Sequence, residues 1–144
     1  MFYPQYHSEI VVFMDFSFAN AESYLHSISE GYKFRTGQAT PSRTKATMLK
    51  SATTILQQYR SRVIKVIEIR ADGEFCCIQD DVPCRIATAA PGTHVPEIER
   101  SIRYIKEGAR TSQSSLPFKR RPRLLNRGNI YCQIMNANDF PTGD

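Results

Sequence analysis

Three acidic residues lie where carboxylates can bind metal ions. Asp15 lies inside the apolar stretch IVVFMDFSF (10–18). Asp72 follows the apolar stretch VIKVIEI (63–69), and Glu99 lies near the start of an amphipathic segment. A carboxylate inside an apolar strand is costly unless it has a counter-charge, and its oxygens are ligands that Mg²⁺ and Mn²⁺ prefer. These three acids are therefore candidate metal ligands and candidate catalytic residues.

Three carboxylates that converge can hold two divalent ions about 3.5–4 Å apart. Such a pair activates a water or hydroxyl nucleophile and stabilises the leaving oxygen of a phosphodiester. Taken singly, each acid also has a structural interpretation. Asp15 can be a satisfied buried acid, and Asp72 can belong to an ordinary turn. Glu99 can pair with Arg103, four residues later, on a solvated helix face.

Hydrophobic patterning indicates the elements that would position these acids. The stretch 10–18 is typical of a strand buried on both faces, and residues 23–29 and 32–39 complete an antiparallel meander. A helix of about four turns follows, with Ser42 or Thr44 as its N-cap. Residues 63–69 form the next strand. The apolar face of this helix consists of Met48, Leu49, Ala52, Ile55, Leu56 and Tyr59.

The pattern after Asp72 is weaker. A short strand is expected at residues 85–89, and a second helix begins near Thr93, with Pro96 in its first turn. Its buried stripe is Ile98, Ile102, Ile105 and Ala109. The sequence predicts an α/β fold with a mixed sheet in the order β-β-β-α-β-(β)-α. We assign residues 1–118 to this core and residues 119–144 to a basic segment, a short apolar stretch and a final loop.

The bulk properties narrow the function classes. A chain of 144 residues is one domain by length, and its net charge of +5 permits binding to a polyanion. No apolar run approaches the roughly 20 residues that a membrane span needs, and the first residues lack the pattern of a signal peptide. We therefore expect no membrane partner and a nuclear or cytoplasmic protein that is not secreted.

Two motifs carry a family resemblance. Residues 67–75 read IEIRADGEF and residues 94–110 read HVPEIERSIRYIKEGAR. They resemble, respectively, the strand that ends in D-N-G-G-E-F and the N-G-x-x-E-R helix of the integrase core in copia-type LTR-retrotransposon Pol polyproteins. The positions that keep the register of the second motif are Glu99, Arg100, Arg103, Glu107, Ala109 and Arg110. LPF at 116–118 is similar to the Leu-Pro after that helix in the family.

This resemblance implies an RNase H-like fold and a D-D-E triad of Asp15, Asp72 and Glu99. It implies two Mg²⁺ or Mn²⁺ ions, 3′ processing and strand transfer during DNA integration, and LTR ends and target DNA as partners. The resemblance also implies a retrotransposon particle as the location of the protein. Association of the chain into a homo-oligomer stays an open alternative. Two alternatives stay open beside the enzyme: a catalytically inactive nucleic-acid-binding remnant, and a structural or dimerising module.

The sequence also departs from the family pattern. Asp72 and Glu99 are separated by 26 residues, fewer than in retroviral integrases, so a helix or loop of the core is missing or reduced. Gly73 directly follows Asp72 where the family commonly has Asn, and Val95-Pro96 replaces the Asn-Gly before the helix. The core is therefore expected to be a shortened version of the retroviral-integrase type.

Basic residues suggest where nucleic acid would bind. Arg103 and Lys106 lie four and seven residues after Glu99, which puts them on one helix face. The resemblance implies that they contact DNA phosphates, together with Arg110. A second candidate phosphate-binding segment contains Lys119, Arg120, Arg121, Arg123 and Arg127. Ordinary solvated surfaces are the alternative for both sets.

Overall fold

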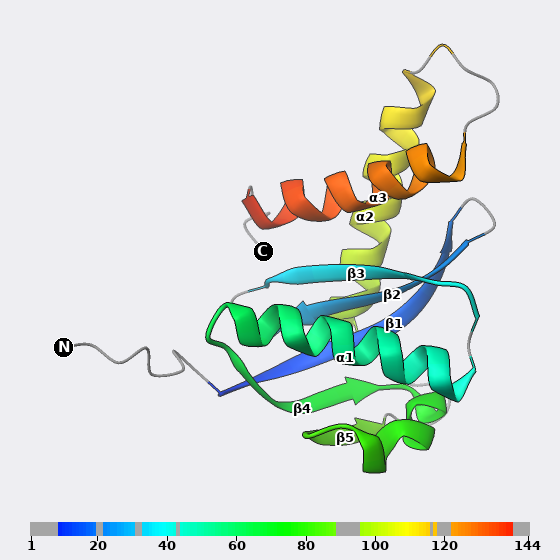
Figure 1. Ribbon diagram of the computed structural model, residues 1–144. Helices are drawn as coiled ribbons and strands as arrows, with labels where there is room; N and C mark the ends of the chain where they lie inside the picture. Colours follow the sequence, from blue (N-terminus) through cyan, green and yellow to red (C-terminus); the bar gives the residue numbers. More distant parts are fainter. Residues whose placement is uncertain are drawn as a thin grey trace.

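A computed structural model of the chain describes residues 9–19, 22–30, 33–42, 44–88, 96–115, 117 and 122–139 (Figure 1). The strands are β1 (Glu9–Ala19), β2 (Glu22–Ser29), β3 (Arg35–Thr40), β4 (Lys65–Ala71) and β5 (Arg85–Thr88). The helices are α1 (Lys45–Ser61), the 3-10 helix η1 (Gly73–Asp81), α2 (Pro96–Ser114) and α3 (Arg123–Asp139).

The strands form one mixed sheet in the order β3-β2-β1-β4-β5. β1, β2 and β3 are antiparallel neighbours, so the predicted meander is confirmed. β4 is parallel to β1, and β5 is parallel to β4. α1 follows β3 and leads back across the sheet to β4, which is the crossover that parallel neighbours require. Thr44 is its N-cap, as the sequence predicts, and its side chain accepts a hydrogen bond from the Thr47 N–H.

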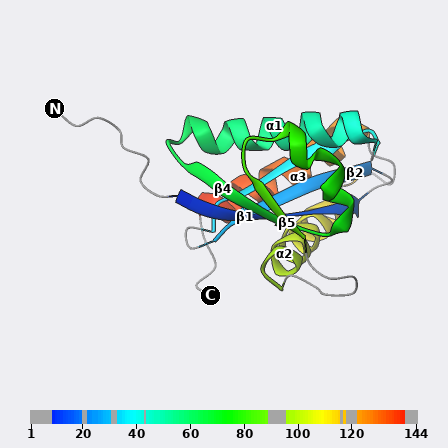
Figure 2. The ribbon, with the colours of Figure 1, turned by 90° about the horizontal axis from the view of Figure 1, so that it is seen from below.

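The sheet is covered on both faces, with α1 on one side and α2 on the other (Figure 2). Alternate residues of a strand point to opposite faces, and β1 follows this rule. Met14 and Phe16 belong to the core beneath α1, whereas Phe13 packs with Ile98 on the α2 side. Asp15 therefore lies on the α2 side, whereas its chain neighbours Met14 and Phe16 are buried on the α1 side.

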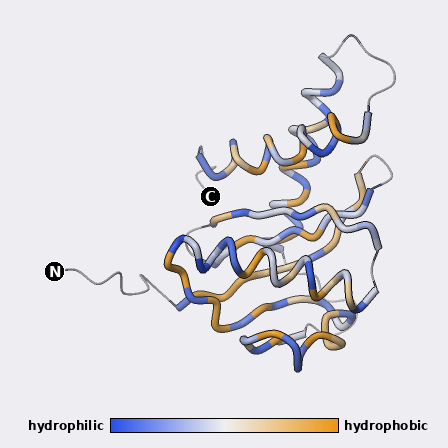
Figure 3. Tube along the Cα trace, in the orientation of Figure 1, coloured by the Kyte–Doolittle hydropathy of each residue, from blue (hydrophilic) through white to orange (hydrophobic). Residues whose placement is uncertain are grey.

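Hydrophobic positions run along the central strands and alternate with hydrophilic ones along the helices (Figure 3). In α2, Ile98, Ile105 and Ala109 are buried and Ile102 is partly buried, as expected. Ser101 is also buried in this stripe. Its hydroxyl has a hydrogen-bond partner there, because it accepts from the Arg35 Nε–H at 3.0 Å. The predicted apolar stripe is confirmed with one polar addition.

The C-terminal part differs from its prediction. Where a basic loop, a short apolar stretch and a final loop were expected, residues 123–139 form α3. Its buried residues are Ile130, Ile134 and Ala137. The second and third lie four and seven positions after Ile130, so all three share one helix face. Two of them join Tyr24 and Ile105 in one hydrophobic cluster. The described residues beyond the predicted boundary at 118 thus pack on the same sheet.

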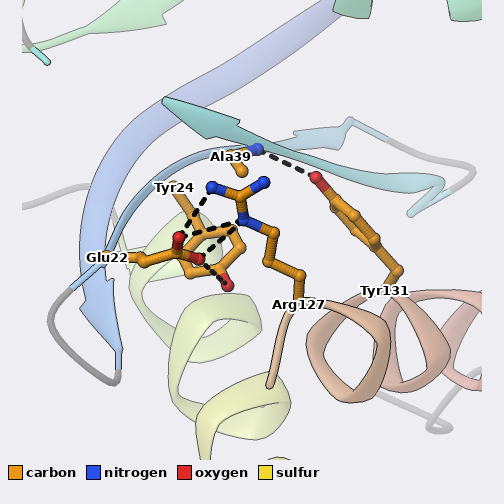
Figure 4. A network of polar contacts seen from close by, with 5 residues as sticks. All are labelled: Glu22, Tyr24, Ala39, Arg127 and Tyr131. Carbon is orange, nitrogen blue, oxygen red and sulfur yellow. Dashed lines mark hydrogen bonds and ion pairs between the residues drawn. The ribbon is translucent and has the colours of Figure 1, made fainter. Parts of the chain in front are cut away.

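Arg127 shows how α3 is fixed to the sheet (Figure 4). Its guanidinium donates to the Glu22 carboxylate of β2, with a shortest N–O distance of 2.7 Å. The Tyr24 hydroxyl donates to the same carboxylate at 3.1 Å, and the Tyr131 hydroxyl accepts from the Ala39 N–H of β3 at 3.1 Å. Arg127 was grouped with the predicted phosphate-binding segment, and the structure instead engages it in an intramolecular ion pair.

Candidate functional site

Asp15 of β1 and Asp72, the residue directly after β4, lie at corresponding positions along two adjacent parallel strands. Phe13 of β1 is the register partner of Arg70 of β4, and each acid comes two residues later. The Arg70 guanidinium lies over the Phe13 ring on the α2 side, 5.8 Å from its centroid. The backbone of Asp72 is extended (φ −79°, ψ 176°), so the alternation of faces continues beyond β4. Both acids therefore belong to the α2 side, near the same end of the paired strands.

Asp15 and Glu99 line one hollow of about 450 Å³ between β1 and α2. Asp15 is half-buried, and its Oδ1 accepts from the Phe16 N–H at 2.8 Å. Glu99 lies in the first turn of α2, on the flank that faces this hollow. Asp72 does not line the hollow: it is exposed, and its Oδ1 accepts from the Glu74 N–H at 3.2 Å as the N-cap of η1.

Two of the three predicted metal ligands thus line one hollow, and the third lies outside it. Within the described ranges, no group of three or more His, Cys, Asp or Glu side chains stands close enough to hold a metal ion. The donor atoms fit Mg²⁺ or Mn²⁺, because all three side chains offer carboxylate oxygens. Bringing in Asp72 means breaking its N-cap hydrogen bond, which costs about 1 kcal/mol.

The predicted phosphate-binding residues of α2 gather at the same hollow. Arg103, Lys106 and Arg110 all line it, together with Glu107. Arg103 and Arg110 are exposed, and Lys106 is partly exposed. Three basic and three acidic side chains therefore line the same hollow. The other predicted phosphate contacts, Lys119, Arg120 and Arg121, lie outside the described residues.

The site contains a polar pair that the sequence analysis did not select. His26 of β2 is the register partner of Asp15, and its Nε2 lies 2.6 Å from the Ser17 Oγ. Burial, and next the charge of Lys106, lower the pKa of His26 to about 4, so the imidazole is neutral at pH 7. The sequence does contain a signal that His26 is buried. Tyr24, His26 and Ile28 are two residues apart in β2, so all three lie on the strand face that α2 covers.

A mixed five-stranded sheet in this order, with helices on both faces, is the RNase H-like fold of integrase catalytic cores. Among solved structures, the chain is similar to the catalytic core domain of BIV integrase, with a TM-score of 0.71 and 14% sequence identity. The match covers 95% of this chain and 88% of that chain. The predicted fold class is confirmed.

Sequence comparisons add nothing to this structural likeness. No family model matches the chain, and no curated protein matches it. The copia-type origin inferred from the two motifs stays a prediction. In the part of the chain that the structure describes, no helix has the length and apolar character to cross a membrane.

Proposed function

We propose that this chain is an integrase-like polynucleotidyl transferase or nuclease that acts on DNA. The observation that supports it best is the shared hollow, where Asp15 and Glu99 stand beside Arg103, Lys106 and Arg110. Asp72 lies two residues after Arg70, the register partner of Phe13, and would complete a set of three carboxylates for two Mg²⁺ or Mn²⁺ ions. Such ions, when bound, activate a nucleophile and stabilise the leaving oxygen of a phosphodiester.

The side chains of this protein would position the nucleic acid. Arg103, Lys106 and Arg110 would neutralise backbone phosphates at a DNA end, because cations on one face of α2 track a polyanion. Contacts of this kind fix orientation without reading sequence. In the family that the motifs resemble, the reaction is 3′ processing of LTR ends followed by strand transfer into target DNA, and we propose the same sequence here.

The test is a nicking and joining assay on a labelled duplex that carries an LTR-end sequence. Activity is expected in Mg²⁺ or Mn²⁺ and is expected to disappear in EDTA. In parallel, isothermal titration of the protein with Mn²⁺ alone should show binding that requires Asp15 and Glu99. If neither cation supports any cleavage or joining while the protein binds DNA, the enzymatic proposal is wrong.

A catalytically inactive nucleic-acid-binding chain is the second candidate. Two observations favour it: the described residues hold no ready group of three metal-binding side chains, and three cations line the hollow. This candidate predicts salt-dependent DNA binding that is unchanged by EDTA, with no product in either metal. The same assay therefore separates the two candidates.

The contribution of α2 to DNA binding can be measured through its salt dependence. Each protein cation that neutralises a phosphate adds about 0.9 to the slope of log K against log salt concentration. Changing Arg103, Lys106 and Arg110 together to Gln should make that slope shallower by about 2.7, and should weaken binding at low salt at least about tenfold. Fluorescence anisotropy with a labelled duplex gives both quantities.

The matched control removes three exposed cations elsewhere: Lys50 and Arg60 of α1, and Arg85 of β5. Its net charge equals that of the α2 variant, so a general charge effect would change both slopes equally. Equal slopes in the two variants would remove α2 as the phosphate-binding surface.

A further inference from the structure

Ser17 is placed to contact whatever the hollow binds. It lies two residues after Asp15 in β1, and its register partner Tyr24 packs with α2 and α3 residues, so Ser17 faces the α2 side. The residue is only 8% exposed, yet it lines the hollow together with Arg103 and Lys106. The hydroxyl is therefore a directional hydrogen-bonding group among less directional charges.

His26 is enclosed on its other side by apolar groups. Its register partner in β3 is Gly37, where an added Cβ would clash with the Ile134 side chain of α3 and would lie 3.7 Å from the His26 Nδ1. That Nδ1 is buried and finds no hydrogen-bond partner among the described residues. Within the described part of the chain, the ring makes one hydrogen-bonding contact, between its Nε2 and the Ser17 Oγ.

This asymmetry selects the position of the ring proton. A buried N–H without an acceptor loses a full hydrogen bond to water, and such groups are rare in folded proteins. Placing the proton on Nε2 avoids an orphaned N–H and leaves only an unused lone pair on Nδ1. His26 then donates to the Ser17 Oγ. Because the serine oxygen accepts from His26, its own hydroxyl proton is available to a different acceptor.

We propose that Ser17 donates a hydrogen bond to a backbone phosphate oxygen of nucleic acid in the hollow, and that His26 is the positioning residue that fixes Ser17 as a donor. This inference rests on the proposed function, since it names the ligand of the same hollow. Arg103, Lys106 and Arg110 supply the charge that attracts the phosphate, and the Ser17 hydroxyl supplies a short bond of defined direction.

The position of the ring proton is testable without DNA. Long-range ¹H–¹⁵N correlation spectra of the histidine rings distinguish the two neutral tautomers, and the chain has three histidines. The signals that disappear in His26→Gln belong to His26. They are expected to report a protonated Nε2 and a bare Nδ1 at pH 7. A proton on Nδ1 would overturn the proposal whether or not the protein binds DNA.

The phosphate contact is tested by binding of an LTR-end duplex in EDTA. Ser17→Ala should weaken binding about tenfold, whereas Ser17→Thr keeps the hydroxyl and should restore most of the affinity. Ser51→Ala, which removes a buried serine of α1, is the control for a general loss of packing. If Ser17→Ala binds as tightly as the unchanged protein, this proposal alone fails. If the unchanged protein binds no DNA, both the proposed function and the ligand inferred here fail.

Discussion

Asp72→Asn is expected to abolish metal-dependent nicking and joining without unfolding the protein. Asn lacks the charge that would hold a divalent ion, and metal ions contribute several kcal/mol to stabilising charge in phosphoryl transfer. A loss of about 4 kcal/mol corresponds to roughly a thousandfold in rate. The nicking assay in Mg²⁺ and Mn²⁺ measures this directly, with product from the unchanged protein as reference.

The structure makes this substitution a clean one. Asp72 is exposed and caps η1 through its Oδ1, and Asn is as good an N-cap as Asp. The thermal midpoint of Asp72→Asn should therefore stay close to that of the unchanged protein. Asp80→Asn is the matched control, because Asp80 is an exposed carboxylate of the same 3-10 helix. Full activity in Asp72→Asn would remove the proposed mechanism.

The free energy of unfolding is expected to fall by about 3 kcal/mol between pH 7 and pH 4 because of His26. Its pKa is about 4 in the folded protein, against the ordinary histidine pKa of 6.5 in the unfolded chain. Between these values the unfolded chain binds more protons, so acidification favours unfolding. The part of the unfolding free energy that depends on a neutral His26 is thus fully present above pH 6.5 and is lost as the pH falls towards 4. The magnitude follows from about 1.4 kcal/mol for each pKa unit.

Denaturant unfolding at pH 7, 6, 5 and 4 measures this effect. His26→Gln has no ionisable ring, so its stability should decline less over the same range, and the difference between the two curves isolates His26 from the carboxylates. The gap should open between pH 6.5 and pH 4. Parallel curves for the two proteins would mean that the imidazole becomes protonated without a penalty in the folded state.

Much of the site geometry was accessible from strand periodicity. A run as apolar as residues 10–18 is buried on both faces, and the alternation within it puts Asp15 opposite Met14 and Phe16. In β4 the alternation is interrupted, because the register with β1 shifts between Val66 and Glu68 and both Val66 and Ile69 pack on the α1 side. Only from Ile69 onward does it put Asp72 on the α2 side, so local pattern alone could not assign that face. The register between these strands required the structure, because it depends on tertiary packing and not on local pattern.

Other parts could not be predicted from local pattern. α3 contains Gly128 and several Asn residues, which are weak helix formers, and its three buried apolar positions look like a short isolated stretch until the sheet is present. The Ser17–His26 pair comes from two strands whose cross-strand register had to be known first. Helices stabilised mainly by packing are the ones that sequence propensity misses.

α3 has a consequence for how the molecule meets its neighbours. The Asn138 side chain accepts from the Arg35 N–H and donates to the Arg35 carbonyl oxygen, both at 2.7 Å, and Tyr131 takes the Ala39 N–H. Side chains of α3 thus occupy outer hydrogen-bonding groups of β3, the last strand on that side of the sheet. A chain cut at residue 118 would leave those groups available to template strand addition between molecules. We therefore expect α3 to protect this edge of the sheet from pairing with a strand of another molecule.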